Sequence, residues 1–197
     1  MPNTGKSSKR KIKKLHKSIF LDRDGVINHD PIGDYIKTWK EFQFLPGVIS
    51  GLQELTQKDF EIIIVSNQAG VGDGIYSKRA LNDITRKMLA SFRRSGIRIR
   101  GVYYCMHGKN AGCQCRKPEV GLFQKASRNL NYQKRNTFFI GDKISDILAG
   151  KRFGLKTVFI LTGHGKKDLI KLRSGRINPD LIARNFQEAI NAVLANP

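Results

Sequence analysis

Acidic residues are scarce in this chain, whose 197 residues include 16 Asp and Glu against 36 Lys and Arg. The formal net charge of +20 predicts attraction to polyanions, such as phosphorylated metabolites, nucleic acid or acidic lipid. Residues 1–17 hold seven of the cations and no acid. We expect these residues to form a disordered tail with at most non-specific polyanion contacts, and residues 18–197 to form a single domain.

Long apolar runs are absent as well. No stretch approaches the roughly 18 consecutive apolar residues that a membrane-spanning helix requires, and no apolar signal-peptide segment follows the basic N-terminal residues. The tail also lacks the aromatic residues that would stack on the bases of nucleic acid. We therefore expect a cytoplasmic protein that has no membrane span and is a monomer.

Cysteine is rare, and Cys105, Cys113 and Cys115 all lie within eleven residues. An odd number of cysteines in a chain expected to be cytoplasmic argues against a disulfide framework. His107 lies among them, and three Cys with one His make a complete tetrahedral zinc set. We predict one structural zinc ion without a catalytic role.

What the chain does have is a regular alternation of predicted strands and helices. Apolar runs predict strands at residues 18–22, 61–66, 99–105, 137–141 and 156–161. Helical spacing predicts a helix after Pro46 and Gly47, and further helices at 77–95, 119–130, about 143–153 and about 185–195. This alternation predicts an α/β fold with a Rossmann-like parallel sheet and helices on both faces. In such sheets, sites lie beyond the carboxyl ends of the strands, and residues 25–46 are long enough to line that site or to form a flap over it.

Two carboxylates follow the first predicted strand, in Asp22-Arg23-Asp24-Gly25. Alternate side chains share a face of extended backbone, so Asp22 and Asp24 can point at one metal and one phosphate. An aspartate nucleophile can form an aspartyl-phosphate, and a second carboxylate can protonate the leaving group and then activate water. A calcium loop is excluded, because Val26 and Ile27 occupy positions that it needs. On its own, the motif leaves a polar loop after a core strand as an alternative.

Two further motifs carry groups that bind phosphate. Ser66-Asn67-Gln68 follows the second predicted strand, and its hydroxyl, amide and backbone N–H groups can hold a transferring phosphoryl group. Arg116 and Lys117 follow the last cysteine and supply a planar fork and a point charge for phosphate. In a chain with so many cations, this pair alone would be weak evidence.

Gly141-Asp142-Lys143 follows the fourth predicted strand. Asp142 is placed to bind Mg²⁺ opposite Asp22, because this ion prefers a few hard oxygen ligands completed by water and phosphate. Lys143 can neutralise the charge of the phosphate or of the nucleophile. Asp146 lies one helical turn further on, where it either caps the helix or supports its neighbours.

Taken together and in this order, the motifs resemble those of the haloacid dehalogenase superfamily of phosphohydrolases, over about residues 18–165. Within it the chain is similar to the small subgroup of D-glycero-D-manno-heptose 1,7-bisphosphate 7-phosphatases and histidinol-phosphate phosphatases. The resemblance is carried by D-R-D-G, S-N-Q, C-x-H followed by C-x-C-R-K-P, and G-D-K-x-x-D. It implies a capless haloacid dehalogenase fold with a zinc loop.

The resemblance also implies residue roles. Asp22 would be the nucleophile and Asp24 the general acid/base, with Mg²⁺ held by Asp22, the Asp24 carbonyl and Asp142. Phosphate and substrate would be bound by Ser66, Asn67, Gln68, Arg116, Lys117 and Lys143, and by Asp30 and Tyr35 in the stretch that lines the substrate pocket. Zinc would be held by Cys105, His107, Cys113 and Cys115.

The implied function is a Mg²⁺-dependent phosphomonoesterase that removes the 7-phosphate of the heptose bisphosphate, a precursor of ADP-heptose and the lipopolysaccharide core. Histidinol-phosphate phosphatase, polynucleotide 3′-phosphatase and a nucleic-acid-binding protein on this scaffold remain alternatives. Asp73 stands where the heptose enzymes usually carry Arg, and Ser66 where they carry Thr. Gly141-Asp142-Lys143 and the stretch 162–165 favour the heptose enzymes, although His164 itself has no assigned role.

Overall fold

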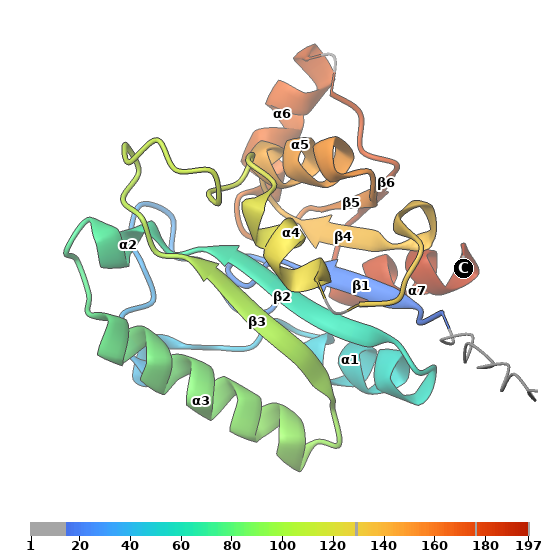
Figure 1. Cartoon of the computed structure of the whole chain (residues 1–197), viewed down its shortest axis with the longest axis horizontal. Helices are drawn as coiled ribbons and strands as arrows, with labels where there is room; N and C mark the ends of the chain where they lie inside the picture. The colour runs from blue at the N-terminus through green and yellow to red at the C-terminus, as the bar shows by residue number, and fades with distance from the viewer. Residues whose placement is uncertain (1–14, 129, 176, 197) are drawn as a thin grey trace, which may run out of the picture.

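The structure, a computed structural model, describes residues 15–128, 130–175 and 177–196. Its centre is a six-stranded sheet in the order β3-β2-β1-β4-β5-β6, and every neighbouring pair is parallel (Figure 1). The strands are β1 (Ser18–Leu21), β2 (Glu61–Asn67), β3 (Ile99–Cys105), β4 (Phe138–Gly141), β5 (Lys156–Ile160) and β6 (Leu181–Ala183). The predicted α/β fold with a parallel sheet is confirmed.

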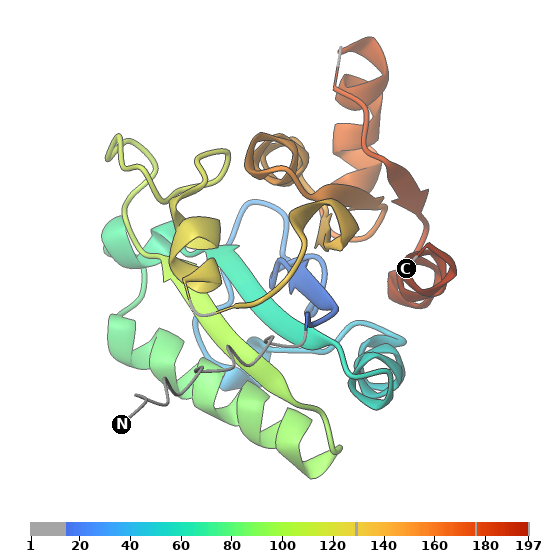
Figure 2. The same ribbon diagram turned by 45° about the vertical axis from the view of Figure 1, so that its right-hand side comes forward.

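Helices cover both faces of this sheet. They are α1 (Val48–Gln57), α2 (Ala69–Gly72), α3 (Lys78–Arg94), α4 (Gly121–Ser127), α5 (Ile144–Phe153), α6 (Gly165–Ser174) and α7 (Phe186–Ala195), with short 3-10 helices at Trp39–Glu41 and Lys134–Asn136. One core cluster contains side chains of α1, α3 and α7, and a second contains side chains of α4 and α5. Figure 2 shows these two groups on opposite sides of the sheet.

The strands are apolar throughout because both of their faces are buried. In β1, Ile19 and Leu21 belong to the cluster with α1, α3 and α7, whereas Phe20 belongs to the cluster with α4 and α5. All three side chains are fully buried, as the period-2 geometry of a strand between two helical layers requires. This double burial holds the carboxyl end of β1, where Asp22 begins the site, in a fixed position.

Most predicted elements form within a few residues of their expected bounds. The helix expected at 77–95 is α3, and it begins where the Ser77 hydroxyl accepts a hydrogen bond from the Ala80 N–H at 3.1 Å. Besides the two short 3-10 helices, three elements were not predicted. Helix α2 is a single turn with two glycines, α6 is mostly polar and leaves Ile170 73% exposed, and β6 has only three residues. None of them shows the apolar periodicity on which the predictions rest.

The long segment between β1 and α1 folds over α3 and reaches the carboxyl edge of the sheet. Trp39, Phe42 and Phe44 pack against one another, and the Phe44 ring lies 5.3 Å from the Phe92 ring of α3. This aromatic contact anchors the segment, of which Asp30, Gly33, Asp34 and Tyr35 line the cleft described below. The expectation that residues 25–46 line the site is met by this part of the segment.

Residues 1–14 of the predicted tail lie outside the described residues. The last two residues of that stretch bond to the domain: the His16 N–H donates to the Asn131 carbonyl, and the Lys17 carbonyl accepts from the Glu61 N–H, both at 2.8 Å. The structure therefore places His16 and Lys17 with the sheet. None of the described helices is long and apolar enough to cross a membrane.

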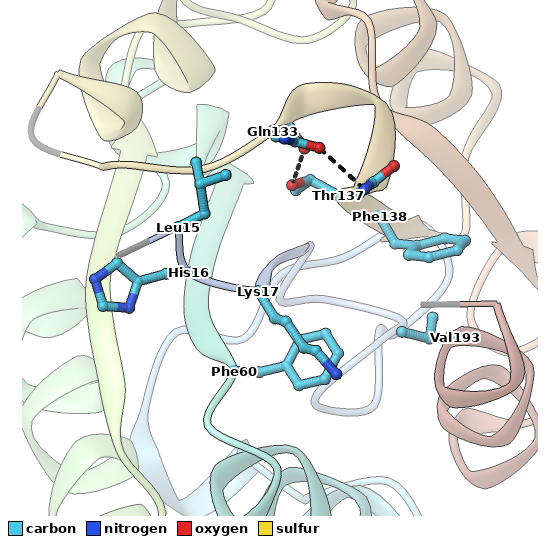
Figure 3. A pocket seen from close by; sticks show the side chains of 9 residues that line it. Leu15, His16, Lys17, Phe60, Gln133, Thr137, Phe138 and Val193 are labelled. Atoms are coloured by element: carbon cyan, nitrogen blue, oxygen red, sulfur yellow. Dashed lines mark hydrogen bonds between the residues drawn. The ribbon is translucent and has the colours of Figure 1, made fainter. Parts of the chain in front are cut away.

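A cavity of about 200 Å³ lies at the amino edge of the sheet (Figure 3). It is lined by Leu15, His16, Lys17, Phe60, Gln133, Asn136, Thr137, Phe138 and Val193. The Thr137 hydroxyl donates to the Gln133 carbonyl at 2.8 Å. No carboxylate is among these lining residues, so this cavity lacks the groups that the sequence predicts for the site.

Candidate active site

Lys117 is a buried cation that joins two of the predicted motifs. Its side chain is 1% exposed, and its ammonium lies 3.0 Å from Asp22 Oδ1 and 2.8 Å from Asp146 Oδ1. It also donates to the Val65 carbonyl at 3.0 Å. Burial lowers the pKa of Lys117, but Asp146 and Asp22 outweigh burial and raise it. The lysine is therefore charged, and it fixes Asp22 at the end of β1.

Asp146 was predicted either to cap the helix that follows β4 or to support neighbouring side chains, and in the structure it does both. Its Oδ2 accepts the Lys143 N–H at 3.0 Å and caps α5, while Oδ1 faces Lys117. The carboxylate is fully buried.

Asp142 is fully buried at the end of β4, beside β1. Its Oδ2 accepts the His164 N–H at 2.8 Å, but Oδ1 has no hydrogen-bond partner among the described residues. Oxygen atoms of Asp22, Asp142 and Asp146 lie within 4.8 Å of one another. Burial, together with Asp146 and Asp22, raises the pKa of Asp142 well above its usual value despite the nearby Lys143. Three buried carboxylates with an unbonded oxygen fit a divalent cation with oxygen ligands.

Gly25 and Gly163 pack so closely against the Asp142 carboxylate that a side chain at either position would collide with it. A Cβ added to Gly25 would lie 2.2 Å from Asp142 Oδ2, and one added to Gly163 would lie 2.3 Å from the same atom. Both glycines have positive φ angles, 81° and 51°, which favour glycine for a second reason. The loops after β1 and β5 therefore close directly on this carboxylate.

Asp24 is held by a hydrogen-bond network behind the cleft. Arg23 donates to both of its oxygens at 2.7–3.0 Å, and Asn28 and Gln68 donate at 2.9 and 2.7 Å. Tyr76 in turn donates to Gln68 at 2.7 Å. Burial raises the pKa of Asp24, but Arg23 and these donors outweigh it and lower the pKa. The network therefore keeps Asp24 ionised.

The Ser66-Asn67-Gln68 turn divides its side chains between the cleft and the interior. Asn67 lines the cleft and makes two hydrogen bonds with the Lys117 backbone, at 3.0 and 3.1 Å. Ser66 and Gln68 are each 1% exposed, and Gln68 donates to the Ser66 hydroxyl at 3.2 Å. The structure therefore places these two predicted phosphate ligands beneath the cleft, where Gln68 contacts Asp24.

The four predicted zinc ligands come together after β3. Ligand atoms of Cys105, His107, Cys113 and Cys115 all lie within 4.8 Å of one another. The three sulfur–sulfur distances are 3.1, 3.5 and 3.6 Å. Zinc–sulfur bonds of about 2.3 Å in a tetrahedron place sulfurs roughly 3.8 Å apart, so the cluster is close to the size that zinc requires.

A cleft of about 560 Å³ opens at the carboxyl edge of the sheet. Its lining includes the predicted site residues Asp22, Asp24, Asp30, Tyr35, Asn67, Arg116, Lys117 and Lys143, and also Asp34, Lys109, Ser145, Asp146, His164, Asp168 and Lys171. Arg116 Nη1 is buried without a hydrogen-bond partner among the described residues. A guanidinium N–H with no partner is suited to a phosphate oxygen.

The comparisons with known proteins agree with this arrangement. A family model described as HAD-hydrolase-like matches residues 114–189. The D-glycero-beta-D-manno-heptose-1,7-bisphosphate 7-phosphatase of Pasteurella multocida is 38% identical over an alignment of 156 residues that covers 76% of this chain and 84% of the relative. The enzyme of the same name from Haemophilus ducreyi is 36% identical, over 75% of this chain and 84% of the relative. This chain is a haloacid dehalogenase-like phosphatase.

A solved structure of the same family supports the fold of this phosphatase. The D,D-heptose 1,7-bisphosphate phosphatase of Bordetella bronchiseptica, complexed with magnesium and phosphate, matches with a TM-score of 0.84 at 28% identity. The match covers 92% of this chain and 99% of that chain.

Several residues in the cleft of this phosphatase were missed by sequence reasoning, namely Lys109, Ser145, His164, Asp168 and Lys171. His164 had no assigned role, yet its Nε2 lies 3.3 Å from Asp30, which also receives a hydrogen bond from Lys143 at 2.9 Å. The position of His164 beyond the carboxyl end of β5 could have indicated it. Asp168 and Lys171 lie on α6, which was not predicted, so no signal in the sequence pointed to them.

Proposed function

We propose that this phosphatase removes the 7-phosphate of D-glycero-β-D-manno-heptose 1,7-bisphosphate in a Mg²⁺-dependent reaction. The observation that carries the proposal is the convergence of Asp22, Lys117 and Asp142 at one end of a polar cleft. The names of the relatives support the substrate and its β-anomer. They favour this substrate over histidinol phosphate, a polynucleotide 3′-phosphate or a purely nucleic-acid-binding role.

In the proposed first step, an Asp22 oxygen attacks the phosphorus of the 7-phosphate, and the bond to the sugar oxygen breaks. Asp24 gives its proton to that oxygen, so the sugar leaves as an alcohol and Asp22 carries an aspartyl-phosphate. The resting network keeps Asp24 ionised, so the proton that it donates must first be taken up. An approaching phosphate dianion raises the pKa of Asp24 because like charges disfavour the anion, and the carboxylate accepts a proton from solvent as the substrate binds.

In the second step, water attacks the aspartyl-phosphate and Asp24 takes up a proton of that water. Inorganic phosphate leaves, and Asp22 returns as a carboxylate. Arg116 and Lys117 stabilise the negative charge that develops on the phosphoryl oxygens. Lys117 also limits the freedom of Asp22, so the nucleophile is aligned before the substrate arrives.

Magnesium would be held by Asp22, Asp142 and the Asp24 carbonyl, and it would supply a positive charge that polarises the phosphoryl group. The unbonded Asp142 Oδ1 supports this assignment. Zinc would be held by the Cys105, His107, Cys113 and Cys115 set, in a structural role that orders the loop leading to Arg116. Metal analysis of protein purified without chelators would measure the zinc directly, and a content far below one ion per chain would contradict this part of the proposal.

Phosphate release with Mg²⁺ across a substrate panel tests the function. The panel contains both anomers of heptose 1,7-bisphosphate, histidinol phosphate and a 3′-phosphorylated oligonucleotide. We expect the β-anomer to be hydrolysed with the highest kcat/KM, and Asp22→Asn to abolish its hydrolysis. A higher kcat/KM for histidinol phosphate or the oligonucleotide would overturn the substrate, and release that survives in Asp22→Asn would overturn the mechanism.

A further inference from the structure

Lys109 lies in the segment between two of the predicted zinc ligands and lines the cleft. Its backbone N–H donates to Asp73 Oδ1 at 3.1 Å. Asp73 follows α2 directly and is not among the residues that line the cleft. The Asp73 carboxylate therefore bonds to the backbone of the neighbouring segment outside the cleft, whereas the Lys109 residue itself lines the cleft.

The backbone of Lys109 is fixed by close packing. A Cβ added to Gly72 would lie 2.2 Å from the Gly108 nitrogen, and one added to Gly108 would lie 2.4 Å from Asp73 Oδ1. The end of α2 and the segment after β3 therefore touch backbone to backbone, and in Figure 1 they lie side by side. His107 and Cys113 anchor the segment on both sides of Lys109.

The Lys109 side chain has no acidic partner. Its ammonium lies 5.7 Å from the centre of the Tyr35 ring, within the range of a cation–π contact, and no carboxylate among the described residues forms an ion pair with it. Two other cleft cations are already neutralised, Lys117 by Asp22 and Asp146, and Lys143 by Asp30. Lys109 therefore brings uncompensated positive charge to a part of the cleft formed by Tyr35.

We propose that Lys109 and the face of Tyr35 form a subsite for a second anionic group of the substrate, a phosphate that is bound but not transferred. This inference rests on the proposed function, because only a bisphosphate carries such a group. Arg116 directly precedes Lys117, which contacts Asp22, and the proposed function assigns Arg116 to the transferred phosphate. Lys171, on α6, also lines the cleft without an ion pair among the described residues, so it is the competing candidate.

The test compares heptose 1,7-bisphosphate with heptose 7-phosphate, which differ only in the second phosphate. In Lys109→Met, the kcat/KM ratio of bisphosphate to monophosphate falls by about 10-fold or more, the effect of losing one charge-assisted contact. The loss lies in KM for the bisphosphate, because a contact to a group remote from the reaction holds ground and transition states alike. Asp73→Ala lowers the ratio by a smaller factor, because it loosens the segment without removing the charge.

Lys125→Met on the exposed surface of α4 is the matched control, and its ratio stays at the wild-type value. Zinc content and far-UV circular dichroism establish that each variant is folded. If the wild type prefers the bisphosphate and Lys109→Met keeps that preference, the subsite is wrong while the proposed function stands. If Lys171→Met removes the preference for the bisphosphate and Lys109→Met does not, the subsite is likewise wrong and the proposed function stands. A wild type without any preference would overturn both the proposed substrate and the subsite.

Discussion

The two edges of the parallel sheet use their polar groups in opposite ways. At the amino edge, Asp180 accepts hydrogen bonds from the Thr157 N–H and hydroxyl, both at 2.7 Å, and the small cavity nearby has no carboxylate in its lining. At the carboxyl edge, Asp22, Asp142 and Asp146 crowd around one another, and Asp142 Oδ1 has no partner among the described residues. The amino edge also has one buried unpartnered atom among the described residues, the Ser18 hydroxyl oxygen, whereas at the carboxyl edge the unpartnered atom is a carboxylate oxygen within a group of carboxylates.

This difference indicates which edge of the sheet carries the functional site. Folding by itself favours paired buried polar groups, and at the amino edge even the partly exposed Asp180 carboxylate is paired. Grouped buried carboxylates and an unbonded guanidinium nitrogen oppose folding, unless a metal ion and a phosphate complete them. Perturbed and incompletely bonded groups therefore distinguish the functional edge from the structural one.

The sharpest test of this comparison is the loss of one carboxylate at each edge. Asp22→Asn is expected to lower kcat by at least about 10³-fold, because it removes the proposed nucleophile, whereas Asp180→Asn keeps kcat within about 2-fold. Steady-state phosphate release from the best substrate measures both. Comparable decreases in kcat in the two variants would show that the two edges do not differ in function.

Lys117→Met tests how strongly the crowded carboxylates depend on their shared cation. It leaves Asp22 and Asp146 buried without a counter-charge, and we expect the free energy of unfolding to fall by roughly 3–5 kcal/mol. Urea unfolding followed by circular dichroism measures the change. Lys156, at the amino edge, forms no ion pair with a carboxylate among the described residues. Lys156→Met is therefore expected to lower the free energy of unfolding by less than about 1 kcal/mol. A loss under about 1 kcal/mol in Lys117→Met would contradict the arrangement.

Removal of one predicted zinc ligand tests whether the loop beside the carboxyl edge depends on metal. Cys113→Ser is expected to lower the bound zinc and to reduce Tm by about 5 °C or more. Differential scanning fluorimetry with metal analysis measures both quantities. Ser127→Ala, outside the cluster, serves as a control for the handling of variants. Unchanged zinc and Tm in Cys113→Ser would remove the structural role from this cluster.

The smallest expected effect concerns pH at the amino edge. Burial raises the pKa of Asp180, but the Thr157 hydroxyl and backbone N–H and Lys151 outweigh it and lower the pKa. Stability from this carboxylate is thus present above its unfolded pKa of about 4 and is lost as the pH falls through the lower folded value. Relative to wild type, Asp180→Asn should lose less stability between about pH 4 and pH 2, by under about 1 kcal/mol because the group is partly exposed. Urea unfolding at several pH values checks this, and parallel curves would show that Asp180 does not titrate as described.

The sequence allowed much of the carboxyl edge to be predicted, because chemistry there follows strand ends. Asp22 and Asp142 follow β1 and β4, which are neighbours in the sheet, and the period-2 rule placed the first pair of carboxylates. Spacing could not show that Gln68 turns to Asp24, 44 residues away. It also gave no indication of Lys171, because α6 lacks the apolar periodicity of a buried helix. Local pattern therefore located the strand ends, whereas side-chain directions depended on contacts between distant segments.

One atom, the Lys117 nitrogen, ties together three separate parts of the chain. It contacts Asp22 after β1, the Val65 carbonyl in β2 and Asp146 in α5. Contacts between residues so far apart in sequence form late, because each closes a long loop at an entropic cost. A nascent chain that has emerged only as far as β3 contains the proposed nucleophile, Asp22, but neither Lys117, which contacts it, nor Asp142. Catalytic competence is thus a property of the completed fold, and proteolytic fragments that end before β4 are expected to be silent.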